Sequence, residues 1–417
     1  MNNFEGHSDS FFKAIHIRAD DNIALRKLAT TTGIPLARLK YYNKANVIPT
    51  GRDLELICAT TGIQHVELKL KMGTFDRELA QLLRRHANKI SQIIDNESED
   101  QPAKPSTPPL VFETQFGKLY QGDCLNLMRN LASDSIDMVF ADPPFNLNKL
   151  YPSKIDDNLK TEQYLLWCEE WAGECVRLLK PGGSFFVWNL PKWNTYMAQF
   201  LNTRLTFKHW ITADIKYRLP IKGRLYPSHY SLLYYCKGER ASEFHPDRLP
   251  MEICPHCMGD LKDYGGYKNK MNPLGINLSD VWQDIPPVRH AKYKKRNGAN
   301  ELSIKLLDRI IEMASDEGDI VFDPFGGAGT TYAVAELKKR KWVGVEIGPV
   351  DDIVNRFNNI SADAAYLIKI RAALNGLFSE ETMEKRLRLG LWTPDTVRQA
   401  NLKQSQGAVQ LPVFNVP

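Results

Sequence analysis

The sequence predicts an α/β fold, in which a doubly wound and largely parallel sheet is preceded by a small all-α domain. The apolar runs at 136–141 and 320–322 are typical of buried strands. Helical stretches alternate with such runs, as expected when helices cover both faces of a parallel sheet. Near the N-terminus the pattern changes to short helices separated by turns. A chain of 417 residues is long enough for two or three domains.

Residues 1–94 are predicted to form a helical module. A helix, the tight turn at 32–35 and a second helix at 35–43 resemble the helix-turn-helix of phage repressors, whose second helix enters a major groove. Arg38 and Lys40 are then candidate DNA contacts. A helical oligomerisation or partner-binding domain is the alternative. An amphipathic helix is expected at 74–94, with Phe75 on its apolar side.

The remaining chain divides by composition. Residues 95–110 are acidic and then rich in Pro and Ser, which predicts a flexible linker. Strand and helix patterns fill 111–375, the expected α/β domain, and 376–417 should be a helical or irregular tail.

The segment Asp142-Pro143-Pro144-Phe145 directly follows the first of the two strands. Proline stops a strand and biases the residue before it toward extended geometry, so a carboxylate should be held at the carboxyl edge of the sheet. Open α/β sheets bind ligands at that edge. A carboxylate, a rigid carbonyl and an aromatic ring suit an exocyclic amine on a planar base. An ordinary strand-ending turn is the alternative for this segment taken alone.

The second half of the chain favours a ligand site. The strand at 320–322 leads through Asp323 to a glycine-rich turn, a helix, and a further strand that ends in Glu346. Glycines let backbone approach a ligand, and a terminal acid suits ribose hydroxyls. The spacing lacks both the full G-x-G-x-x-G pattern and the Lys-Ser/Thr of a P-loop. The sequence therefore predicts a nucleoside site that is neither a dinucleotide site nor a phosphate cradle.

Together the two motifs resemble the amino-methylating DNA methyltransferases of the β arrangement, over about 112–358. In that family the catalytic half precedes the cofactor half, so the Rossmann-like methyltransferase sheet has a circularly permuted motif order. The resemblance implies S-adenosylmethionine as methyl donor and Asp142, Pro143, Pro144 and Phe145 as catalytic residues. It implies a cofactor site made by Asp323, Phe325, Gly327, Gly329, Thr330, Glu346 and Asp123.

At three positions the assignment has an alternative or the chain departs from the family. Asp123 could equally be a helix N-cap. Ala328 stands where the family usually has Ser, and Phe145 stands where it usually has Tyr, so one hydrogen bond and one hydroxyl are missing.

The expected mechanism follows from the electronics of the amine. Asp142 and the Pro143 carbonyl would accept its N–H groups and localise the lone pair for direct attack on the methyl group. The base must leave the duplex first, and Phe145 would stack on it. Asp at the first catalytic position resembles adenine-type members, so N6-adenine is favoured over N4-cytosine.

Basic residues indicate where duplex DNA would dock. Eight Lys or Arg lie between Arg204 and Arg240, and the segment 239–293 is expected to be a target-recognition insertion. A second patch has no acid, which allows it to neutralise phosphates. It consists of Arg289, Lys292, Lys294, Lys295 and Arg296.

Cysteine usage and hydropathy predict a cytoplasmic protein without a membrane span. Seven cysteines show no disulfide pattern, and the mean hydropathy is −0.37. Cys254 and Cys257 are either half of a zinc site, with Cys236 and His245 as further ligands, or an unmetallated turn.

Two other classes of protein are alternatives to a DNA methyltransferase. One is a DNA-binding regulator with a vestigial methyltransferase fold, and another is a methyltransferase acting on RNA or protein amides. The acids at Asp142, Asp323 and Glu346 argue against the first, and the basic insertion argues for duplex DNA. A homodimer and a cognate restriction endonuclease are the expected protein partners.

Overall fold

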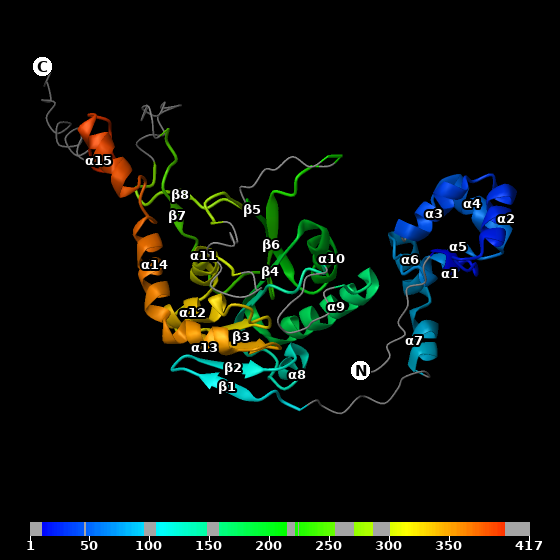
Figure 1. The fold of residues 1–417 in the computed structure, drawn as a ribbon, viewed down its shortest axis with the longest axis horizontal. Coiled ribbons are helices and arrows are strands. Elements are labelled where there is room, and N and C mark those ends of the chain that lie inside the picture. Colours follow the sequence, from blue (N-terminus) through cyan, green and yellow to red (C-terminus); the bar gives the residue numbers. More distant parts are fainter. Residues whose placement is uncertain are drawn as a thin grey trace, which may run out of the picture. The chain divides into compact units, whose positions relative to one another are not determined.

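The computed structural model describes residues 11–45, 47–95, 106–147, 158–214, 222–223, 225–254, 271–286 and 301–396 (Figure 1). The chain divides into two compact units, Met1–Ala103 and Lys104–Pro417. The division falls inside the stretch that the sequence marks as a linker. No helix in the described ranges combines the length and apolarity that crossing a bilayer requires.

The first unit is helical throughout its described part. Its core is formed by apolar side chains such as Phe11, Leu25, Leu39 and Ile57, which are fully buried. Its helices are α1 Phe11–Ala14, α2 Asn22–Thr32, α3 Leu36–Ala45, α4 Gly51–Thr61, α5 His65–Lys71, α6 Arg77–Arg85 and α7 Ala87–Asp95.

The single helix expected at 74–94 is wrong, because α6 ends at Arg85 and α7 begins at Ala87. The chain leaves helical geometry at His86, the C-cap of α6, at φ −108°. Phe75 lies before α6 and is 61% exposed, so it does not join the apolar side with the buried Leu79.

The second unit contains the expected α/β sheet. Its nine strands follow the order β1-β2-β11-β10-β3-β4-β6-β5-β9 among the described residues. The central pairs β2–β11, β11–β10, β10–β3 and β3–β4 are parallel. The strands are β1 Leu110–Glu113, β2 Gly117–Gln121, β3 Ile136–Ala141, β4 Leu179–Asn189, β5 Thr206–Asp214, β6 His229–Cys236, β9 Val281–Trp282, β10 Ile320–Asp323 and β11 Lys341–Glu346.

Helices cover both faces of this sheet because successive strand side chains point in opposite directions. Met138 and Phe140 pack in one core with α11 and α12, whereas Val139 and Ala141 pack in the other with α8, α9 and α10. This is the doubly wound fold that the sequence predicts. The helices are α8 Cys124–Met128, α9 Thr161–Leu178, α10 Pro191–Leu201, α11 Ile304–Ala314, α12 Thr330–Leu337, α13 Asp351–Asn358, α14 Ile360–Ala372 and α15 Glu380–Arg388.

One described part of the 239–293 insertion joins the main sheet, and another forms a small sheet of its own. β7 Arg248–Leu249 pairs with β8 Ile276–Asn277 in a small antiparallel sheet. β9 adds to the edge of the main sheet, where Val281 lies opposite Thr212. The insertion therefore extends the antiparallel half of the sheet beside β5 and β6.

Candidate active site

The two motifs meet at one edge of the sheet. β10 and β3 are parallel neighbours, with Val321 opposite Met138 and Phe322 opposite Val139. Asp323 ends β10 and Asp142 follows β3, so both acids lie at the carboxyl edge of adjacent strands. From β3 the chain continues to β4 on one side, and from β10 it continues to β11 on the other. This reversal is a topological switch point, where open α/β sheets bind their ligands.

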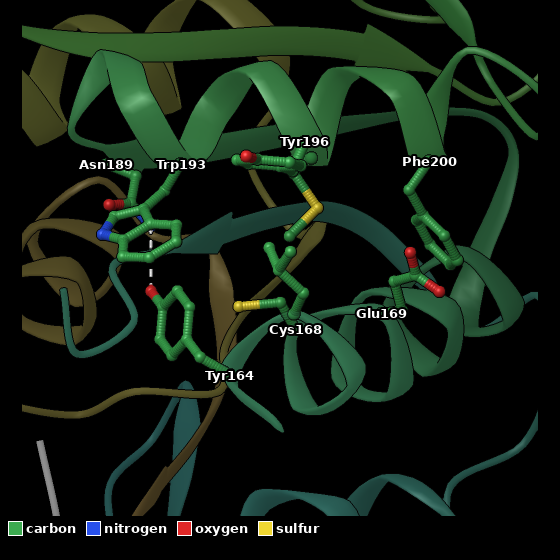
Figure 2. A pocket seen from close by; sticks show the side chains of 9 residues that line it. Tyr164, Cys168, Glu169, Asn189, Trp193, Tyr196 and Phe200 are labelled. Atoms are coloured by element: carbon green, nitrogen blue, oxygen red, sulfur yellow. Dashed lines mark hydrogen bonds between the residues drawn. The ribbon is translucent and has the colours of Figure 1, made fainter. Parts of the chain in front are cut away.

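The catalytic segment is held from the side of α9 and α10. The Tyr164 hydroxyl donates to the Pro144 carbonyl at 2.6 Å, and Trp193 Nε1 donates to the Phe145 carbonyl at 2.7 Å. Figure 2 shows the Tyr164 ring below that of Trp193, with Asn189 beside Trp193 and Cys168 to the right of Tyr164. Asp142 itself is half-buried at the start of the segment. Sequence reasoning missed Tyr164 and Trp193, since neither belongs to a motif.

Phe145 is only 7% exposed, and it lies in an aromatic cluster. Its ring centroid is 5.8 Å from that of Tyr230, which stacks on Trp188 at 5.0 Å. The expected stacking of Phe145 on a target base therefore has to share this cluster with Tyr230 on β6.

The carboxylate of Asp323 shapes the glycine-rich loop from inside. One of its oxygens accepts from the Phe325 amide at 2.9 Å, and the other accepts from the Thr331 hydroxyl at 2.6 Å. The residue is 3% exposed, and burial raises the pKa of this carboxyl to about 7. Asp323 would thus affect cofactor binding indirectly, by fixing the conformation of the glycine-rich loop.

The loop needs glycine at two positions. Gly327 and Gly329 have φ values of +47° and +67°, which L-residues rarely adopt. A Cβ at Gly329 would lie 2.8 Å from Ile353, whereas a Cβ at Gly327 would meet nothing closer than 3.8 Å. The loop is therefore packed tightly on α13 and leaves an open cradle around Gly327.

Glu346 and Asp123 stand at the tips of β11 and β2, beside this cradle. The Glu346 carboxylate accepts from the amides of Gly327 and Gly348, each at 2.7 Å. Its backbone carbonyl accepts from Gly122, which places the exposed Asp123 next to it. Asp123 also caps α8 by accepting from Leu125 at 2.8 Å, so the N-cap role is confirmed.

Two further predicted cofactor residues serve the loop's own packing. The Phe325 ring lies edge-on to Trp171 at 5.2 Å. Thr330 is 4% exposed, and its hydroxyl accepts from Arg356 Nη1 at 2.8 Å.

Arg356 on α13 was missed by sequence reasoning. Its Nη1 also contacts the Ala328 carbonyl at 3.2 Å and Glu301 at 2.9 Å, and its Nε contacts Asp363 at 2.6 Å. One guanidinium thus joins the glycine-rich loop, the start of the α11 segment and α14. Its buried Nη2 lacks a hydrogen-bond partner in the described structure.

Other predicted residues lie elsewhere. Arg38 and Lys40 are exposed on α3 of the first unit, where Arg38 pairs with Asp53 at 3.2 Å. Cys254 is exposed, and Cys257 lies outside the described residues. His245 Nε2 lies 3.0 Å from Glu243 Oε2 and 3.2 Å from Asp316 Oδ1. The whole second basic patch also lies outside the described residues, namely Arg289, Lys292, Lys294, Lys295 and Arg296.

The fold and the paired strand tips define a class of protein, the methyltransferases with a nucleoside-type cofactor cradle beside a carboxylate–proline loop. A family described as DNA methylase, of the N6 and N4 type, matches residues 136–351. The Type II methyltransferase M.BamHI from Bacillus amyloliquefaciens is 46% identical over 374 residues, covering 88% of this chain and 87% of that protein. The chain belongs to this family and is an S-adenosylmethionine-dependent DNA methyltransferase.

The chain is also similar to a second curated protein and to a solved structure. The DNA adenine methyltransferase YhdJ from Escherichia coli is 29% identical over 300 residues, covering 69% of this chain and 97% of that protein. Among solved structures, the cytosine-N4-specific PvuII DNA methyltransferase matches with a TM-score of 0.44 and 20% identity, covering 65% of this chain and 97% of that chain. At that distance the match does not indicate the target base.

The residues present fit the methyl donor. A ligand would find open space at Gly327, and the carboxylate of Glu346 would accept from ribose hydroxyls. When bound, S-adenosylmethionine supplies the electrophilic methyl group.

Proposed function

We propose that the enzyme methylates an exocyclic amine of a base in duplex DNA, within a specific sequence. The adjacency of β3 and β10 carries this proposal, because it sets the Asp142 loop beside the cofactor cradle. Methyl transfer needs the two reactants in contact and aligned, and two neighbouring strand tips supply that proximity.

Asp142 and the Pro143 carbonyl are the proposed acceptors for the amine N–H groups. Withdrawing those hydrogens localises the nitrogen lone pair, which is otherwise delocalised into the base. Asp142 then takes the proton that is lost after transfer. An amine in a stacked duplex cannot reach a half-buried carboxylate, so the base must be flipped out.

Adenine N6 is the base that we favour. The support is the acid at Asp142, together with the name of the adenine-methylating relative YhdJ. Cytosine N4 presents nearly the same amine beside a ring nitrogen. We further propose a cognate restriction endonuclease as partner, because M.BamHI and other relatives are named Type II methyltransferases.

The test is Asp142→Ala with genomic DNA from a methylation-deficient bacterium. The wild type should yield N6-methyladenine in nucleoside mass spectrometry, and the variant should lose at least about a hundredfold in transfer rate while binding S-adenosylmethionine normally. N4-methylcytosine would instead assign the second base. No methylated base from the wild type would overturn the proposed function, and undiminished turnover of the variant would overturn the role of Asp142.

A further inference from the structure

The two central residues of the catalytic segment have no backbone donor to help set its geometry. Pro143 and Pro144 have no N–H, so neither can donate to a neighbouring strand. The proline ring fixes φ but leaves ψ, and ψ determines where each carbonyl points. Groups that hold carbonyls of this segment therefore restrain the backbone that carries the Pro143 carbonyl and the Asp142 side chain.

Two side chains from outside the segment hold consecutive carbonyls. The Tyr164 hydroxyl binds the Pro144 carbonyl at 2.6 Å, and Trp193 Nε1 binds the Phe145 carbonyl at 2.7 Å. Both donors are almost fully buried, with 2% of Tyr164 and 5% of Trp193 exposed. Hydrogen bonds in such surroundings are stronger than in water, and breaking them leaves buried groups unsatisfied.

The donors are themselves fixed in place. The Tyr164 and Trp193 ring centroids lie 4.7 Å apart at an interplanar angle of 54°. Asn189, which ends β4, donates to the Tyr164 hydroxyl at 3.4 Å, as Figure 2 shows. The pair thus connects α9, α10 and the tip of β4 to the catalytic segment.

The far end of the segment is fixed as well. Asn146 has a φ of +52°, a left-handed conformation that non-glycine residues rarely adopt. Its side chain makes two hydrogen bonds with the Leu159 backbone, at 2.8 and 2.9 Å. With β3 before Asp142 and Asn146 after Phe145, the two carbonyl bonds fix the stretch between them.

We infer that Tyr164 and Trp193 are positioning residues for methyl transfer. By binding the carbonyls of Pro144 and Phe145 they turn these toward α9 and α10, which orients the Pro143 carbonyl and the Asp142 carboxylate toward the target amine. This inference rests on the proposed function of the Asp142 loop.

The test removes one hydroxyl, in Tyr164→Phe. The matched control is Tyr235→Phe. The hydroxyl of Tyr235, on β6, also makes a partly buried hydrogen bond, to Asn202 Oδ1 at 2.8 Å, but this bond lies at the C-cap of α10 and does not involve the catalytic segment. Single-turnover methyl transfer from tritiated S-adenosylmethionine to unmethylated genomic DNA gives the rate. Equilibrium dialysis gives cofactor affinity, and the concentration dependence on DNA gives KM.

Tyr164→Phe should lower the transfer rate roughly tenfold, the size of one lost hydrogen bond, with cofactor affinity and KM for DNA within about twofold of wild type. Tyr235→Phe should leave the transfer rate unchanged, although its melting temperature should fall by about as much as that of Tyr164→Phe. Trp193→Phe should likewise lower the transfer rate and leave cofactor affinity nearly unchanged. If Tyr164→Phe does not fold, this second variant tests the inference.

Two results would overturn the inference while leaving the proposed function standing. One is an active wild type with an equally active Tyr164→Phe. The other is a variant whose cofactor affinity falls as much as its rate, as a general structural defect would cause. An inactive wild type that still binds S-adenosylmethionine would count against the proposed function itself.

Discussion

The buried carboxyl of Asp323 predicts how the stability of the catalytic domain depends on pH. Its pKa is raised from the ordinary value of 3.8 to about 7, chiefly because burial disfavours the charged form. That difference corresponds to at most about 4 kcal/mol between the folded and unfolded states. The hydrogen bonds from Phe325 and Thr331 oppose the effect without cancelling it.

The sign follows from the direction of the shift. Below about pH 4 the carboxyl is protonated in both states, so folding incurs no ionisation cost. Between about pH 4 and pH 7 the unfolded chain loses the proton while the folded chain keeps it, and stability falls. Above about pH 7 the loss is complete and stays constant.

The perturbation is Asp323→Asn, which keeps the shape and cannot ionise. The asparagine oxygen can still accept from Phe325, and its amide can donate to the Thr331 hydroxyl. The difference in unfolding free energy should therefore move in favour of the variant, by up to about 4 kcal/mol, as pH rises from 4 to 8. Urea unfolding followed by tryptophan fluorescence at several pH values measures this difference, because other titrating groups cancel between the two proteins.

Asp395→Asn is the matched control, since Asp395 is exposed and solvated in both states. Its unfolding free energy should stay close to that of the wild type, because the substituted side chain is exposed. A difference for Asp323→Asn that is flat with pH, or that favours the wild type at high pH, would refute the reasoning.

Three further predictions concern the cofactor cradle and the first unit. Arg356→Lys cannot serve the several acceptors of the guanidinium, so S-adenosylmethionine affinity should fall about tenfold in equilibrium dialysis; unchanged affinity would exclude a role in holding the loop. Glu346→Gln keeps the shape but accepts from only one of its two amides, and a similar loss is expected in the same assay; full affinity would contradict the ribose assignment. The Arg38→Ala, Lys40→Ala double variant should weaken binding to any duplex in fluorescence anisotropy titrations. The slope of log affinity against log salt concentration should fall by the equivalent of about two phosphate contacts, and an unchanged slope would favour a protein-binding module.

Much of the fold could be predicted from local pattern. The apolar run at 320–322 lies within β10, and the run at Ile136–Ala141 coincides with β3. Such runs are informative because a strand buried on both faces must be apolar along its whole length. The helix at 74–94 failed because apolar spacing does not show where a helix breaks, and α6 and α7 are two pieces.

The sequence predicted the motif residues of the candidate site but not the side chains that hold those motifs in place. Asp142 and Glu346 could be located because strand ends, prolines and glycines have local signatures. Arg356, Tyr164 and Trp193 carry no such signature. Their partners are distant in the chain, and only the packing of α9, α10 and α13 brings them together.

The sequence by itself determined the order of the two motifs and the acids at their strand ends, because backbone stiffness and apolar periodicity act over a few residues. The resemblance of those motifs to a known family indicated the class of enzyme. Only the tertiary structure decided that β3 and β10 are neighbours and that Asp323 points into the loop. It also decided which side chains hold the catalytic carbonyls. Such contacts depend on how helices and strands pack across the whole domain, and packing is a property of the folded chain.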